Sequence, residues 1–70
     1  MNSHETYLKR LIAEANSALE KANSSADDIK RFYQLSHFFN MINAIKKEIM
    51  LNEFNEELRK AAEELLAIVE

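Results

Sequence analysis

The sequence predicts an all-α fold: an antiparallel up-down-up three-helix bundle formed as one domain over residues 1–70. Three observations predict it. The chain contains no glycine and no proline, whereas tight hairpin turns and phosphate-binding loops depend on glycine. Apolar residues recur every three or four positions in three stretches, as expected for amphipathic helices. Two short connections rich in asparagine and serine separate the stretches, so neighbouring helices are expected to run antiparallel and bury their apolar stripes together.

The first predicted helix covers residues 5–22. At about 100° per residue, its apolar residues fall within one arc: Tyr7, Leu8, Leu11, Ile12, Ala15, Ala18, Leu19 and Ala22. The break that follows favours a turn, because Asn23 tolerates the left-handed conformation that ends many helices. Ser24 or Ser25 can then accept from the first free amides of the next helix. Ser25 and Asp28 also have the spacing of a capping box.

The middle predicted helix covers residues 26–51. It includes fourteen consecutive residues without Asp, Glu, Lys or Arg, from Phe32 to Ile45, in a chain in which these four types make up 30% of the residues. One arc of this helix is predicted to face the core: Leu35, Phe38, Phe39, Ile42, Ile45 and Ile49, with Phe32 and Met50 at its edge. The middle helix therefore differs from the other two in that its central part, from Phe32 to Ile45, has no charged residue on any side.

The third predicted helix covers residues 55–69, after a connection placed within Leu51 to Asn55. Asn52 and Asn55 can each end one helix or begin the next, and glutamates follow both. The apolar face of this helix is expected to consist of Phe54, Leu58, Ala61, Ala62, Leu65, Ile68 and Val69, with Leu66 at the rim. Its opposite face is densely charged, as is usual for a helix that faces water.

Composition excludes several classes of function. The net charge is −3, with the basic residues scattered in pairs, so nucleic acid is not expected as a partner. No apolar run approaches the roughly 20 residues that span a bilayer, and the first ten residues lack an apolar signal region. We therefore expect a soluble protein without a signal or transmembrane segment and without membrane binding. The compartment is not indicated, because there is no cysteine.

No catalytic or metal-binding group is expected. His4 and His37 are the two histidines, and neither has thiolate or carboxylate partners at the spacing of a metal site on its own helix face. Ser36 precedes His37, but adjacent residues of a helix point about 100° apart, so they do not form a nucleophile–base pair. The sequence therefore predicts that the chain is not an enzyme and that it binds neither metal nor cofactor.

The side of the middle helix opposite its predicted core arc is the candidate functional site. Solvent-facing helices of this protein carry Glu, Lys and Arg, whereas this side carries uncharged residues, and interface centres are depleted in charge. The residues predicted to bind a partner are Tyr33, Ser36, His37, Asn40, Met41 and Ala44, with Phe39 and Asn43 on one flank. Two readings remain open. The partner can lie at the Phe32 and Phe39 edge or at the Met41 edge, and a skewed bundle can instead turn these residues toward its own helices.

The stretch NEELRKAAEELLAIVE, Asn55 to Glu70, resembles the terminal helix of computationally designed three-helix mini-proteins. The resemblance lies in its dense Glu, Lys, Arg, Ala and Leu content and its acidic start, and the lack of Gly, Pro, Cys and Trp agrees with it. Phe32 to Ile45 and the first helix, rich in Asn and Ser, depart from that composition. Designed mini-protein binders show the same contrast, because one face is fitted to a target, and the resemblance therefore implies a protein partner.

Three hypotheses follow from the sequence. The first is a three-helix protein whose middle helix binds a protein target, and it favours a monomer over a homodimer. It expects Ala44→Arg to leave stability nearly unchanged, as surface changes do. The second is a structural homodimer or larger bundle that associates through the same face. The third is a small natural helical regulator that blocks a larger partner.

Overall fold

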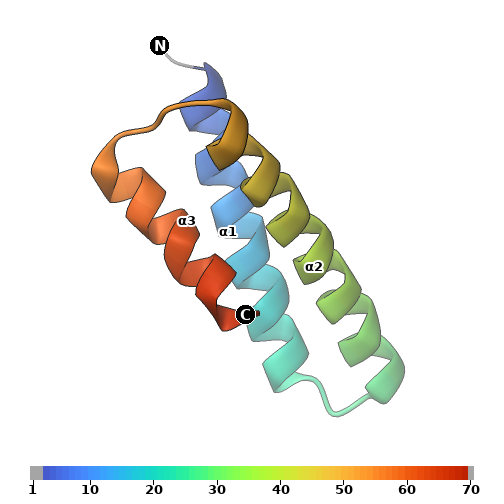
Figure 1. Cartoon of the computed structure of the whole chain (residues 1–70). Helices are drawn as coiled ribbons and strands as arrows, with labels where there is room; N and C mark the ends of the chain where they lie inside the picture. The colour runs from blue at the N-terminus through green and yellow to red at the C-terminus, as the bar shows by residue number, and fades with distance from the viewer. Residues whose placement is uncertain (1–2, 70) are drawn as a thin grey trace.

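The three-helix bundle predicted from the sequence is confirmed. The computed structural model describes residues 3–69, which form three α-helices and no strand: α1 (Ser3–Ser24), α2 (Asp28–Leu51) and α3 (Glu56–Ile68). Successive helices run in opposite directions, α1 and α2 lying side by side along their whole length (Figure 1). α1 extends two residues beyond its predicted range at each end, and α2 begins two residues later than expected.

The third helix is much shorter than the other two. α3 has 13 residues and α2 has 24, so their lengths are about 20 Å and about 36 Å at 1.5 Å per residue. α3 starts beside the carboxyl end of α2 and ends about halfway along the bundle (Figure 1). The half of the molecule nearest the connection between α1 and α2 is therefore built from two helices only.

The first connection differs in detail from the prediction. Asp27 caps α2, because its Oδ1 accepts from the amides of Ile29 at 2.9 Å and Lys30 at 3.4 Å. Ser25, predicted as a cap, instead supports the turn: its Oγ accepts from the Asp27 amide at 3.3 Å. No residue between 3 and 69 has a positive φ, so the left-handed ending predicted for Asn23 is wrong. The Asp27 carboxylate is favoured over the Ser25 hydroxyl as the cap because its negative charge also complements the positive end of the helix dipole.

The second connection lies where the sequence placed it. Asn52 ends α2 in an extended conformation, with its amide donating to the Glu48 carbonyl at 3.0 Å. Asn55 begins α3, because its Oδ1 accepts from the Leu58 amide at 2.8 Å. Each asparagine therefore has one of the two roles that the sequence left open. The asparagine cap satisfies one of the amides that have no partner inside the helix.

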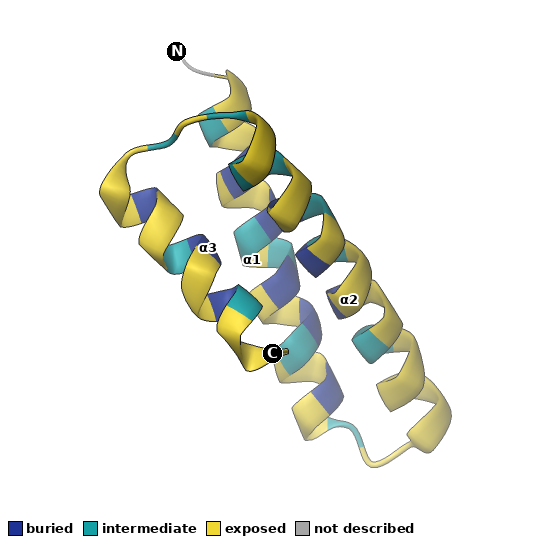
Figure 2. Ribbon diagram, in the orientation of Figure 1, coloured by how far each residue is buried: buried dark blue, intermediate teal, exposed yellow. Residues whose placement is uncertain are grey.

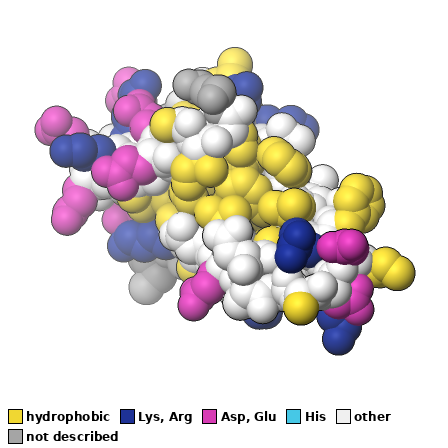
Figure 3. All heavy atoms as spheres, turned by 90° about the horizontal axis from the view of Figure 1, so that it is seen from below, with side chains coloured by type: hydrophobic (Ala, Val, Ile, Leu, Met, Phe, Trp, Pro, Cys, Tyr) yellow, Lys and Arg dark blue, Asp and Glu magenta, His cyan; other side chains and the backbone are white. Residues whose placement is uncertain are grey.

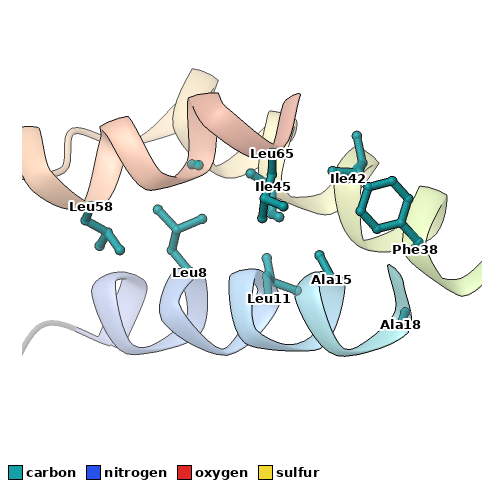
Figure 4. Close-up of a cluster of buried hydrophobic side chains, with 10 residues drawn as sticks. Leu8, Leu11, Ala15, Ala18, Phe38, Ile42, Ile45, Leu58 and Leu65 are labelled. Carbon is teal, nitrogen blue, oxygen red and sulfur yellow. The ribbon is translucent and has the colours of Figure 1, made fainter. Parts of the chain in front are cut away.

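The core draws on all three helices. The buried cluster consists of Leu8, Leu11, Ala15 and Ala18 from α1, Phe38, Ile42 and Ile45 from α2, and Leu58, Ala62 and Leu65 from α3 (Figure 4). Alanines on α1 allow the larger side chains of α2 to approach closely. Phe38, Leu8 and Ile45 are the largest fully buried side chains, and each stabilises the fold by roughly 2–3 kcal/mol relative to an exposed position.

Several residues predicted for the core are exposed. Phe39 has an exposed fraction of 49%, and Phe32 and Met50, expected at the edge of the core, reach 72% and 77%. Figure 2 shows the half of α2 nearest the first connection almost entirely exposed. Tyr7, Ile68 and Val69 are exposed as well. The short α3 does not extend far enough to cover the flank of α2 where Phe32 lies. Phe39 and Met50 are exposed because α2 is rotated about its axis relative to the prediction.

Candidate functional site

Four of the predicted partner-binding residues lie on the side of α2 that points away from the core. Tyr33, Ser36, Asn40 and Asn43 are all exposed, Tyr33 with an exposed fraction of 71%. They occupy a regular helix, because α2 is capped at both ends and is continuous from Asp28 to Leu51. The exposed part of the uncharged stretch is therefore presented to solvent by a continuous helix.

His37 is exposed but lies at the α1 side of this surface. It lines a shallow cleft of about 210 Å³ together with Gln34 of α2 and four residues of α1: Glu14, Ser17, Ala18 and Lys21. Ligand pockets are usually 300–1,000 Å³ and mostly apolar. The cleft at His37 is smaller than that and is lined mainly by polar side chains.

Met41 and Ala44 lie elsewhere than expected. Both are partly buried and pack against the core cluster. The buried side of α2 is centred on Phe38 and Ile45, which lies roughly 50° around the helix from the centre of the arc predicted from the sequence. This rotation turns Met41 and Ala44 toward α1 and turns Phe39 outward. The prediction that Ala44 faces outward is therefore wrong.

The same rotation adds large apolar side chains to the exterior. Ile29 is 81% exposed, Leu51 is 77% exposed, and Phe32 and Met50 are similarly open to solvent. We define the outer face of α2 as the residues within an arc of about 120° opposite the core: Ile29, Phe32, Tyr33, Ser36, Phe39, Asn40, Asn43, Lys47, Met50 and Leu51. Of the two edges left open by the sequence, the Phe32 and Phe39 edge is the one exposed to solvent.

The orientation of Phe39 is set by its neighbour in the core. The Phe38 and Phe39 rings lie edge to face, with centroids 5.6 Å apart and an interplanar angle of 65°. This geometry is favourable for aromatic pairs. Phe38 is buried, so its ring supports one side of the half-exposed Phe39 ring. The outer face therefore contains an aromatic side chain that makes a favourable contact with the core.

Apolar side chains are also exposed at the end of α3. Ile68 and Val69 have exposed fractions of 55% and 39%. Seen along the bundle from below, apolar side chains form a continuous area in the middle of the molecule, with acidic and basic side chains gathered mainly toward its sides (Figure 3). A contiguous apolar area rimmed by charge is typical of an interaction surface.

Charged chemistry elsewhere is confined to isolated pairs. The Glu48 Oε1 atom is buried and lies 3.6 Å from Nδ1 of His4, too far for a hydrogen bond. The other ion pairs of residues 3–69 join exposed side chains one helical turn apart, such as Arg59 and Glu63 at 3.0 Å. No group of three or more His, Cys, Asp or Glu side chains suited to a metal ion occurs between residues 3 and 69. No helix in this part of the chain is both long and apolar enough to cross a membrane.

Sequence reasoning missed Ile29, Phe32, Met50 and Leu51 as surface residues. The signal was present in the spacing, because residues 29, 32, 36, 39, 43, 46 and 50 follow a seven-residue repeat. That repeat runs along the helix beside the core stripe, and the amphipathic pattern alone did not separate the two stripes.

The comparisons with known proteins found no matching family model, no similar curated protein and no similar solved structure.

Proposed function

We propose that this protein is a non-enzymatic binding module that presents the outer face of α2 to a protein partner. One observation carries the proposal. Phe32, Tyr33 and Phe39 are large aromatic side chains with exposed fractions of 72%, 71% and 49%, within a stretch that contains no Asp, Glu, Lys or Arg. Exposed aromatic residues without neighbouring charge are the composition found at the centre of protein interfaces.

The structure of α2 suits this role. Tyr and Phe lose little conformational entropy on binding because each has two side-chain torsions, and a helix fixes their relative positions in advance. Ser36 lies between the aromatic residues, Asn40 and Asn43 follow Phe39, and all three are exposed. They offer hydrogen-bonding groups that carry no charge, so removing them from water costs less free energy than removing a charged side chain. The contrast between Asn55 to Glu70, which resembles designed three-helix mini-proteins, and the uncharged stretch from Phe32 to Ile45 is also shown by designed mini-protein binders, and it supports the same function.

The test compares the two tyrosines of the chain. Tyr33 lies on the outer face of α2, whereas Tyr7 lies on α1 with an exposed fraction of 47%. The protein is immobilised, captured partners are identified, and the dissociation constant of each purified partner is measured by calorimetry. Loss of an aromatic hot-spot residue costs at least about 1–2 kcal/mol of binding free energy, or about five- to thirtyfold in affinity.

We expect Tyr33→Ser to weaken binding by at least that factor and Tyr7→Ser to leave it unchanged. Circular dichroism of both variants checks that the helices remain intact. Equal affinity of Tyr33→Ser and the unmodified protein would contradict the proposal, as would equal weakening by both substitutions.

A further inference from the structure

We propose that the partner of the outer face is a second copy of this chain, bound antiparallel, α2 against α2. This inference rests on the proposed function and names its partner. The first observation is the seven-residue repeat of exposed positions along α2. Its members alternate at spacings of three and four, as at the seam of a coiled coil: Ile29, Phe32, Ser36, Phe39, Asn43 and Met50, with Lys46 between the last two.

This repeat is separate from the core of the monomer. The buried residues of α2 are Phe38, Ile42 and Ile45, and none of them belongs to it. A helix with one apolar stripe needs one neighbour, and α2 already has α1 and α3 on its buried side. The stripe formed by the seven-residue repeat packs against no other helix of residues 3–69. Its spacing is nevertheless the spacing by which two helices pair in a coiled coil.

The second observation is the exposed area. Six large side chains of the outer face have exposed fractions between 49% and 81%: Ile29, Phe32, Tyr33, Phe39, Met50 and Leu51. When Lys46 lies opposite Ile29 of the second copy, the paired part of the stripe runs from Ile29 to Lys46, and Met50 and Leu51 lie beyond it. At about 200 Å² for each large side chain, Ile29, Phe32, Tyr33 and Phe39 present roughly 550 Å² to solvent. Two copies therefore offer roughly 1,100 Å² in total, which exceeds the roughly 1,000 Å² expected of a biological interface and lies in the range of weak, transient ones.

The third observation is the distribution of charge, which selects the antiparallel arrangement. Asp28 lies at the start of α2 with a side-chain exposure of 94%, and Lys46 and Lys47 lie near its end. A parallel pair would place Lys46 directly against Lys46 of the second copy within the seam, where like charges repel. An antiparallel pair places Lys46 opposite Ile29 and beside Asp28 of the second copy, so that opposite charges meet at both ends.

The same register matches side-chain sizes. With Lys46 opposite Ile29, each Phe39 lies opposite Ser36 of the second copy, and each Phe32 lies opposite Asn43. A large ring therefore meets a small or uncharged polar side chain at every central layer of the seam. Lys46 and Lys47 form no ion pair with any other part of residues 3–69, and the one ion pair of Asp28 is with Arg31 at 3.7 Å. Such exposed pairs contribute little to stability, so Asp28 can exchange Arg31 for a lysine of the second copy.

The first experiment measures mass against concentration. Sedimentation equilibrium of the full chain is expected to show the mass rising from 8.1 kDa toward twice that value as the concentration increases into the high micromolar range, because an interface of this size is weak. Phe39→Glu is expected to weaken association at least about a hundredfold, because two carboxylates enter the seam. Tyr7→Glu is its control, since Tyr7 is 47% exposed and Phe39 49%, and it is expected to leave association unchanged.

The second experiment exchanges charges. Lys46→Glu alone and Asp28→Lys alone are each expected to weaken association about tenfold, since each creates a like-charge contact across the antiparallel seam. The double variant carrying both changes is expected to recover most of that loss. Lys60→Glu on α3 makes the same change in net charge as Lys46→Glu, far from the seam, and is expected to have no effect.

Two results would overturn the second-copy proposal. One is a mass of 8.1 kDa at every concentration up to about 1 mM, which would leave the outer face for a different protein. The other is a dimer that Phe39→Glu does not weaken or that the double charge variant does not restore. Neither result decides the proposed function, because that is judged by the separate effect of Tyr33→Ser and Tyr7→Ser on a captured partner.

Discussion

The division of the α2 phenylalanines between core and surface gives the most direct test of the fold. Phe38 has an exposed fraction of 1%, and Phe32, less than two helical turns away, has 72%. Replacing each with alanine removes the same atoms from two opposite environments. The free energy of unfolding of both variants, measured by urea denaturation at low micromolar concentration, therefore reports how α2 is rotated about its axis.

The expected magnitudes follow from burial. A phenylalanine side chain of about 200 Å², at about 25 cal/mol per Å², loses up to about 5 kcal/mol when it is removed from a buried site, and measured values are about 3–5 kcal/mol. Phe32 buries less than a third of that area, and the unfolded chain already buries some of it. We therefore expect Phe32→Ala to cost less than about 1 kcal/mol.

A domain of this size is stable by only a few kcal/mol, so Phe38→Ala is expected to unfold most of the protein. Phe38→Leu keeps the comparison measurable, because it should cost about 1–2 kcal/mol and leave a cooperative transition. If Phe32→Ala cost as much as Phe38→Leu, or if Phe38→Ala unfolded at the same urea concentration as the unmodified protein, the rotation of α2 described above would be refuted.

Three further substitutions test particular contacts. Ala44→Arg is now expected to cost about 1–3 kcal/mol because Ala44 packs against the core, whereas Ser36→Arg on the outer face should cost less than about 0.5 kcal/mol; equal melting temperatures of the two would contradict this. Asn55→Ala should cost about 1 kcal/mol in urea denaturation, because it removes the acceptor of the Leu58 amide, and an unchanged midpoint would argue against the cap. Ile42→Asp buries an unpaired carboxylate, so circular dichroism should show no cooperative transition.

The sequence predicts the helices well because their signals are local. The periodicity of apolar residues and the lack of glycine and proline act within a few residues, and so does the asparagine at each end of the second connection. Asn55 caps α3 through a bond to a residue only three positions away. For the same reason the prediction of a bundle is confirmed: three amphipathic stripes and two short connections leave little freedom in how they pack.

The rotation of α2 about its axis is set by tertiary packing. It is therefore harder to predict from the sequence than the positions of the helices. Apolar residues surround most of this helix, so their arc is broad and its centre is poorly defined. α1 is its main neighbour and turns Phe38 and Ile45 inward, which moves Phe39 to the surface and Ala44 toward the core. The length of α3 also matters, because a helix that ended further along the bundle would have covered the flank of α2 near Phe32. No residue of α2 itself carries that information.

The two halves of the bundle differ in how firmly they are held. Beyond the end of α3, opening of the α1–α2 hairpin breaks contacts with only one neighbour, so its amide hydrogens should exchange with solvent sooner than those around Ile42 and Ile45. Phe32 and Tyr33 belong to this more easily opened half. A partner that binds Phe32 and Tyr33 would also order the turn from Ser25 to Asp27. The amide hydrogens of this turn would then exchange with solvent more slowly in the complex. Because α3 is short, binding at Phe32 and Tyr33 is coupled to local opening of the α1–α2 hairpin.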